Sequence, residues 1–257
     1  MIGVLDRVLD KARLRRAPGR PSQVHLAVTD RCFLPCLHCD IWKNKTPDVD
    51  GEVWANVIDR LGDWCAPAGM NFVGGEPLLR KDLEQLMGRA VRNGFEVSFN
   101  TNGWLVTDAR AQAISQAGVS VAYVSLDGMN AATVDHSRGK KGSFDKAMQA
   151  IDRLDALPNP RVVIAAILHG ENADEMAGLL EFVRDRNLQL VVQPLYQNFG
   201  DNEYDPNWHE NTPLWPRTAS ALASIDAAIE LLVAERLRGG AVCNPVGQIA
   251  AFSEHFR

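Results

Sequence analysis

The sequence contains no long hydrophobic run. Its longest uninterrupted apolar stretch, residues 162–168, is far shorter than the roughly 20 residues that a membrane-spanning helix needs. Near the N-terminus the apolar residues alternate with charged ones, which is not the pattern of a secretory signal peptide. We therefore expect a cytoplasmic protein without a membrane span.

Positive charge is not in excess either. The 27 lysine and arginine residues are outnumbered by 32 aspartate and glutamate residues, which gives a net charge of −5. Proteins that bind nucleic acids by electrostatics are usually basic, so we expect no nucleic-acid partner. A hydrophobic content of 46% is typical of a globular chain, and 257 residues suffice for one large α/β domain or two small ones.

Cysteine is scarce, and its distribution is uneven. Five cysteines in 257 residues are too few for a disulfide-stabilised secreted fold. Three of them, Cys32, Cys36 and Cys39, fall within eight residues, whereas Cys65 and Cys243 have no neighbouring thiols. Free thiols are compatible with a reducing cytoplasm, and the clustered ones indicate a metal or iron–sulfur site.

The loop with the spacing Cys-x-x-x-Cys-x-x-Cys admits two kinds of site. Three thiolates can ligate an iron–sulfur cube and leave one iron open for another ligand. Alternatively, the same cysteines and His38 could bind a structural zinc ion as three thiolates and one imidazole. His38 is adjacent to Cys39, and neighbouring residues seldom reach one small tetrahedral ion together. The spacing therefore favours the iron–sulfur cluster.

Strand and helix signals alternate along most of the chain. Strands are predicted over residues 23–29, 70–73, 96–99, 119–124, 161–168 and 188–192. Each is followed by a loop and a helix, with Thr107 and Ser143 as expected N-caps. These units predict an α/β fold with a parallel sheet, either flat or curled into a barrel. The polar and cysteine-rich loops all follow strands, so they meet where parallel folds keep their active sites.

The flanks of this core have a different pattern. We divide the chain into residues 1–21, an amphipathic helix over 3–16 and a linker; residues 22–197, the core; and residues 198–257, a loop and a helical extension. The segment 196–215 is rich in Asn, Asp, Pro and aromatics, and we predict a lid or substrate loop there rather than a disordered segment. A long helix is expected over 218–238.

Two segments together resemble the signature of the radical S-adenosylmethionine (radical SAM) enzymes. They are the cysteine loop and Gly74-Gly75-Glu76-Pro77, which follows the second predicted strand. The resemblance covers about residues 22–197 and implies a partial (β/α)6 barrel of the TIM type. It also implies an enzyme in which the three cysteines hold a [4Fe–4S] cluster that cleaves S-adenosylmethionine (SAM) reductively. The resulting 5′-deoxyadenosyl radical abstracts hydrogen from an organic substrate.

The resemblance also assigns roles to further residues of the SAM site. In the Gly-Gly-Glu-Pro segment, Gly74 and Gly75 would supply backbone contacts, and Glu76 would bind the SAM amino group. Five further residues are candidates for the SAM site. Ser125 would contact the ribose or carboxylate, and Asp127 lies at the end of the same strand. Arg138 would bind the carboxylate unless it is an ordinary loop residue, His38 would lie near the adenine, and Asn102 is a candidate unless it only forms a turn.

The core looks closest to the subfamily with a SPASM or twitch extension, in which C-terminal cysteines hold auxiliary clusters. Cys65 and Cys243 are the cysteines that remain outside the first loop, and two cysteines cannot ligate another cube. Either the protein never had auxiliary clusters, or the chain is cut short before them; the abrupt end at Arg257, just after an amphipathic segment, favours the second.

Substrate and partners follow from the same resemblance. A peptide substrate is favoured, and a small metabolite, sugar, nucleotide or lipid precursor is the alternative. The implied partner is an electron donor such as a flavodoxin or ferredoxin. A hypothesis of another class is a non-catalytic three-cysteine metal-binding module, which would not need the Gly-Gly-Glu-Pro segment or Ser125.

Overall fold

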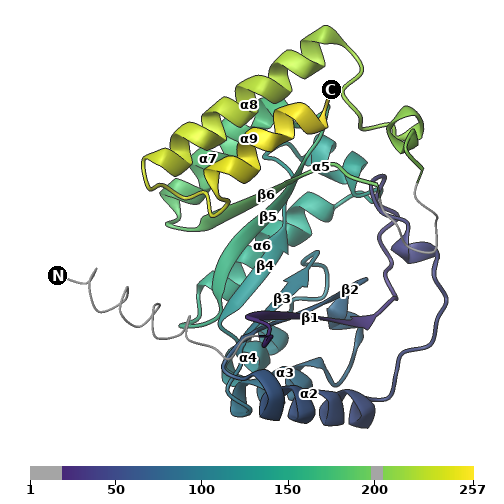
Figure 1. Ribbon diagram of the computed structural model, residues 1–257, viewed down its shortest axis with the longest axis vertical. Helices are drawn as coiled ribbons and strands as arrows, with labels where there is room; N and C mark the ends of the chain where they lie inside the picture. The colour runs from purple at the N-terminus through teal and green to yellow at the C-terminus, as the bar shows by residue number, and fades with distance from the viewer. Residues whose placement is uncertain (1–18, 198–204) are drawn as a thin grey trace.

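A computed structural model describes residues 19–197 and 205–257 (Figure 1). The helix expected over residues 3–16 lies outside the described residues. Within them, none of the helices is long and apolar enough to span a bilayer.

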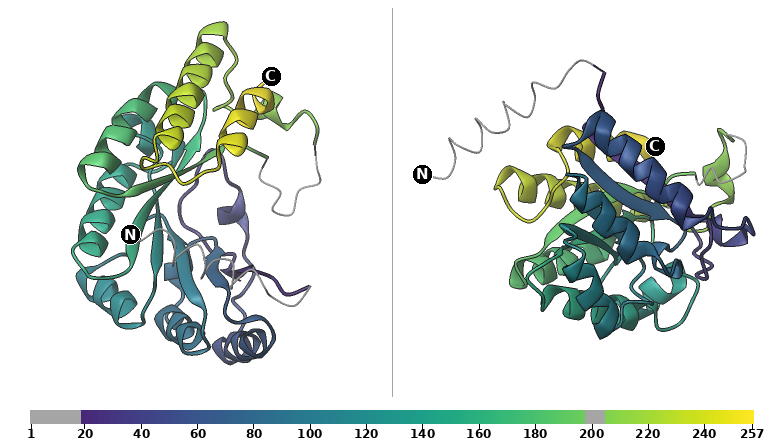
Figure 2. Two further views of the ribbon diagram at one scale, coloured as in Figure 1. Left: turned by 60° about the vertical axis from the view of Figure 1, so that its left-hand side comes forward. Right: turned by 90° about the horizontal axis from the view of Figure 1, so that it is seen from below.

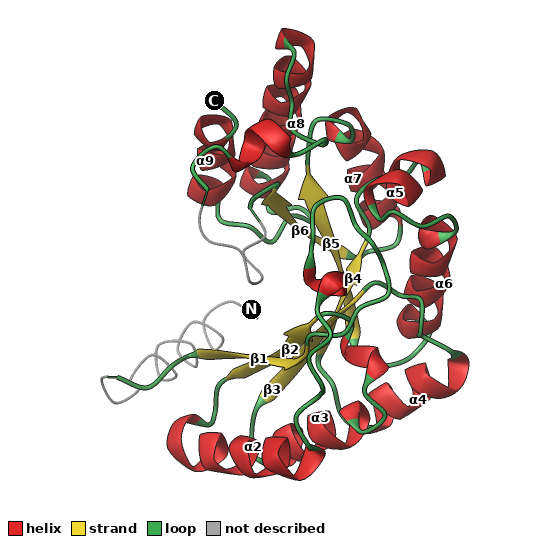
Figure 3. Cartoon of the chain, turned by 90° about the vertical axis from the view of Figure 1, so that its right-hand side faces the viewer, coloured by secondary structure: helices red, strands yellow, loops and turns green. Residues whose placement is uncertain are grey.

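Six parallel strands form one sheet, in which each strand pairs with the next along the chain. The strands are β1 (Gln23–Thr29), β2 (Gly69–Gly74), β3 (Glu96–Thr101), β4 (Val121–Ser125), β5 (Arg161–Leu168) and β6 (Gln189–Pro194). The sheet curls but does not close, and the opening lies between β1 and β6 (Figure 3). The predicted partial (β/α)6 barrel is therefore confirmed.

Helices cover the convex side of the sheet (Figure 2). They are α2 (Gly51–Cys65), α3 (Leu83–Arg92), α4 (Asp108–Gln116), α5 (Ala131–Ser137), α6 (Ser143–Asp155) and α7 (Met176–Asp185). Short 3-10 helices are η1 (Ile41–Lys43), η2 (Pro77–Leu79), η3 (Ala173–Glu175) and η4 (Trp208–Asn211). The last of these lies in the segment predicted to be a lid.

One local prediction is wrong, and one helix was missed. Ser143 is not the N-cap of α6: the cap is Gly142, at a positive φ of 88°, and the Ser143 hydroxyl donates to the carbonyl of Lys140. Helix α5 was not predicted. It has seven residues, of which Val134 and Ser137 are buried, so it carries no apolar stripe that periodicity could detect.

The two faces of the sheet differ in polarity. Buried apolar side chains such as Phe72 on β2 and Phe99 on β3 pack toward the helices and form the core. The alternate positions, which face the barrel interior, include register partners with polar side chains: His25 opposite Asn71, and Asn100 opposite Tyr123. A TIM barrel normally fills its interior with branched apolar residues, so this interior is built differently.

The C-terminal helices α8 (Ala219–Leu237) and α9 (Val246–His255) confirm the predicted helical extension. Between them, Val242 forms a parallel bridge with Leu190, and the Asn244 amide group bonds both backbone groups of Val192. These contacts satisfy part of the free edge of β6 and attach the extension to the barrel.

Candidate active site

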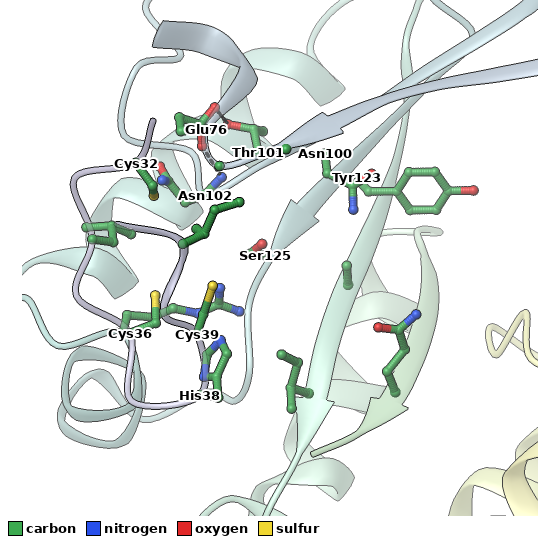
Figure 4. Close-up of a pocket in the computed structure, with 18 of the residues that line it drawn as sticks. Cys32, Cys36, His38, Cys39, Glu76, Asn100, Thr101, Asn102, Tyr123 and Ser125 are labelled. Atoms are coloured by element: carbon green, nitrogen blue, oxygen red, sulfur yellow. Dashed lines mark hydrogen bonds between the residues drawn. The ribbon is translucent and has the colours of Figure 1, made fainter. Parts of the chain in front are cut away.

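The cysteine loop follows β1 and borders a cavity of about 440 Å³ at the carboxyl ends of the strands. The loop contributes the three cysteines and His38, and the loops after β2 and β3 contribute Glu76 and Asn102 (Figure 4). Of the predicted site residues, the cavity is lined by Cys32, Cys36, His38, Cys39, Gly74, Gly75, Glu76, Asn102, Ser125 and Arg138. Asp127 does not line it.

The turn after β2 packs backbone against backbone on the start of the cysteine loop. The amides of Gly75 and Glu76 donate to the carbonyls of Thr29 and Arg31, each at 2.8 Å. A Cβ on Gly75 would lie 2.2 Å from the Arg31 carbonyl oxygen, which no side chain permits. Glycine is therefore required at this position for the close approach of the two loops.

Glu76 is buried and holds the turns around it together. Its carboxylate accepts hydrogen bonds from the amides of Leu78 and Asn102 and from the hydroxyl of Thr101, at 2.8 to 3.1 Å. Burial raises the pKa of Glu76 to about 7, although these hydrogen bonds and Arg110 oppose the shift. Because Glu76 also borders the cavity, its charge near neutral pH depends on what binds there.

Asp127 and Arg138 form a buried ion pair behind the cysteine loop. Both guanidinium-to-carboxylate bonds measure 2.7 Å, and Asp127 is fully buried. Burial alone would raise the pKa of Asp127, but the charge of Arg138 brings it down to about 2. The same carboxylate accepts from the amide of Ile167 on β5. The alternative that Arg138 is an exposed loop residue is therefore wrong, since it is 8% exposed.

The environment of the thiols favours their protonated form while no metal is bound. Burial raises the pKa of Cys36 to about 11, although Arg138 opposes the shift. Burial also raises the pKa of Cys32. Metal or cluster binding must therefore displace protons from these thiols.

The histidine of the loop is neutral and incompletely bonded. Burial, together with Arg138, lowers the pKa of His38 to about 3, and its buried Nδ1 has no hydrogen-bond partner among the described residues. No group of three His, Cys, Asp or Glu side chains within residues 19–197 and 205–257 is placed to hold a single metal ion. The zinc alternative requires such convergence on one ion. A cube does not, because each cysteine binds a different iron.

Several cavity residues were not predicted from the sequence. On the inner face of the sheet, the Asn71 amide donates to Asn100 at 3.0 Å and accepts from Ser98 at 3.1 Å. Further polar residues of the cavity are His25, Thr101, Tyr123 and Gln193. Their signal is polar residues at alternate strand positions that should face a barrel interior. Among the described residues that line the cavity there is no lysine, and the sole arginine, Arg138, is paired.

The ion pair yields a prediction about stability. Arg138→Ala leaves the buried Asp127 carboxylate without its partner, which should lower the free energy of unfolding by about 3–5 kcal/mol. Arg89→Ala is the control: its partner Asp59 is 38% exposed, so water replaces the lost interaction and the loss of stability should be much smaller. Urea unfolding of the cluster-free proteins measures both. Equal stability of the two variants would contradict the structural role of the pair.

Comparisons with known proteins agree with this geometry. The family model of the Radical SAM superfamily matches residues 26–183. A probable GTP 3′,8-cyclase of Methanocella arvoryzae is 32% identical over 189 residues, which cover 72% of the chain and 60% of that protein. The mycofactocin maturase MftC of Mycolicibacterium smegmatis is 30% identical over 166 residues, which cover 64% of the chain and 42% of that protein. The chain thus spans only part of these relatives.

Solved structures share the fold. SuiB of Streptococcus suis bound to S-adenosylmethionine superposes with a TM-score of 0.67 at 14% identity, covering 92% of this chain and 53% of SuiB. The native anSMEcpe structure with bound AdoMet gives a TM-score of 0.66 at 16% identity, covering 86% of this chain and 63% of that one. Since the family model matches more than half of the sequence, the chain belongs to the Radical SAM superfamily, whose members are enzymes that use a [4Fe–4S] cluster and SAM.

Proposed function

We propose that Cys32, Cys36 and Cys39 hold the [4Fe–4S] cluster and that SAM binds beside it in the cavity. The observation that carries the proposal is that three thiols and the Gly-Gly-Glu turn border one cavity. When bound, the cluster and SAM supply a 5′-deoxyadenosyl radical, which abstracts hydrogen from an organic substrate. We also propose that residues 22–197 form the catalytic core and that residues 198–257 form its extension.

The donor set suits these groups. Three thiols can ligate three of the four irons of a cube and leave one coordination position for SAM. Glu76 would accept a hydrogen bond from the SAM amino group, and Ser125 and Asn102 border the cavity at positions suited to the ribose or carboxylate. Asp127 would act through Arg138, by keeping the guanidinium in place beside the cysteine loop. His38, neutral and half-buried, would lie near the adenine.

The opposite wall of the cavity points to an uncharged, amide-bearing substrate such as a peptide. Asn71, Asn100, Tyr123 and Gln193 offer hydrogen-bond donors and acceptors but no formal charge. A triphosphate or a polycarboxylate would need unpaired cationic side chains, and Arg138 is already bonded to Asp127. An uncharged small metabolite or sugar is the second candidate. The required electron would come from a donor such as a flavodoxin or ferredoxin.

The assignment of the cluster is tested with cysteine variants. After anaerobic reconstitution, the wild-type protein should contain one [4Fe–4S] cluster and release 5′-deoxyadenosine when dithionite and SAM are added. Cys36→Ala should lose the cluster and this activity, because a ligand is missing. The controls Cys65→Ala and Cys243→Ala should keep both. A wild-type protein that binds stoichiometric zinc and takes up no iron or sulfide would contradict the proposal.

The rate of 5′-deoxyadenosine formation also tests the substrate class. A library of uncharged peptides should contain members that raise the rate of 5′-deoxyadenosine formation, and GTP should not raise it. Asn71→Ala should abolish the peptide effect and leave the substrate-free rate unchanged, because Asn71 lies on β2 and belongs neither to the cysteine loop nor to the Gly-Gly-Glu turn. Stimulation by GTP but by no peptide would contradict the assignment of substrate class.

The role of Glu76 predicts a pH dependence. Since its pKa is about 7, the carboxylate is mostly protonated at pH 6 and ionised at pH 8. SAM should therefore bind more tightly as the pH rises from 6 to 8, by up to about tenfold per unit below pH 7. Conversely, protonated Glu76 stabilises the SAM-free fold at low pH, and this stabilisation is lost as the pH rises through about 7.

Equilibrium dialysis of cluster-loaded protein measures the SAM affinity. Glu76→Gln should bind SAM more weakly and without this pH dependence, whereas the exposed control Glu181→Gln should behave as wild type. An unchanged pH profile in Glu76→Gln would show that another group is responsible.

A further inference from the structure

Three lysines and two aromatic side chains form a patch beside the cysteine loop. Phe33, which follows Cys32, contacts Trp104 edge to face, with ring centroids 6.0 Å apart. The Lys140 Nζ lies 4.0 Å from the Trp104 centroid and 4.9 Å from that of Phe33, and the Lys146 Nζ lies 6.0 Å from Trp104. Together with the exposed Lys141, these residues are called the lysine–aromatic patch.

The positive charge of the patch is not neutralised by ion pairs. In the described part of the chain, none of its three lysines lies within 4.0 Å of a carboxylate, whereas many arginines elsewhere form such pairs. Asp135, in the same stretch, accepts from the amides of Gly142 and Phe144 at the start of α6, and Asp145 is exposed. The three lysines outnumber these two carboxylates, so the patch is positive on a chain whose net charge is −5.

The patch is attached directly to the loop that carries the thiols. The Leu37 amide donates to the carbonyl of Ser137 at 2.9 Å. A Cβ on Gly139 would lie 2.1 Å from the carbonyl oxygen of Pro35, so the segment before Lys140 packs on the loop backbone. The patch residues are not among those that line the cavity, so a protein seated on the patch would contact the cysteine loop from outside the cavity.

We propose that the lysine–aromatic patch docks an acidic one-electron carrier protein, so that the electron enters the cluster from this side. Complementary charge selects and steers such a partner, and aromatic side chains supply contact area in a small redox interface. One electron leaves the reduced carrier and is taken up by the oxidised cluster, without a proton or a covalent bond being exchanged. This inference rests on the proposed function, because it requires the cluster at the three cysteines.

Binding is measured first on cluster-free protein, with an acidic flavodoxin and an acidic plant-type ferredoxin as probes. Wild type should bind at least one of them, with an affinity that falls as salt is added. The variant Lys141→Glu/Lys146→Glu should bind about tenfold more weakly. The matched control is Arg60→Glu/Arg92→Glu, which changes the net charge equally in the C-terminal halves of α2 and α3, and it should bind as wild type.

SAM cleavage in the cluster-loaded proteins provides the second readout. The lysine variant should lose carrier-driven cleavage and keep cleavage driven by dithionite, a small reductant that needs no docking surface. Unchanged carrier binding in the lysine variant, equal losses in variant and control, or no binding of either carrier to wild type would overturn the proposal. Absence of dithionite-driven cleavage in wild type would instead refute the proposed function, while the binding data would still report on the patch.

Discussion

The contact between the turn after β2 and the loop after β1 is the constraint on which the site depends. Two backbone hydrogen bonds of 2.8 Å join the turn to Thr29 and Arg31, directly before the first cysteine. Glycine at position 75 makes this distance possible, and the buried Glu76 side chain connects the same turn to the loop after β3. Three successive strands thereby fix the position of the cysteine loop and the polar groups opposite it.

The Asp127–Arg138 pair supports the other side of the loop. It joins the end of β4 to the segment after α5 and, through Ile167, to β5. Arg138 also faces the Cys36 thiol, whose pKa it lowers against the effect of burial. One buried pair thus links the frame of the barrel to the electrostatics of a cluster ligand.

The sequence predicted the elements whose signals are local. Apolar runs located all six strands, and Thr107 caps α4 as expected, because a cap needs only its own helix. The position of each candidate loop followed from strand order. Ser143 was misplaced as a cap because Gly142, at a positive φ, begins the helix without a side chain.

Features that depend on contacts between distant residues could not be predicted. The pairing of Asp127 with Arg138 emerges only when α5 folds back on β4, whereas the sequence indicated Arg138 only as a candidate for the SAM carboxylate or as an ordinary loop arginine. The same holds for the Asn71–Asn100 hydrogen bond, which joins residues from two strands. It holds equally for the position of Lys140 over Trp104, which brings two separate loops together.

The most direct test of the account is whether SAM binds the cluster through its amino group. Electron–nuclear double resonance of the reduced, cluster-loaded protein with SAM labelled by ¹⁵N at the amino group measures this contact. We predict a ¹⁵N hyperfine coupling that disappears in unlabelled samples, because three cysteines leave one iron open. A cluster whose spectrum does not change on addition of saturating SAM would contradict the central claim.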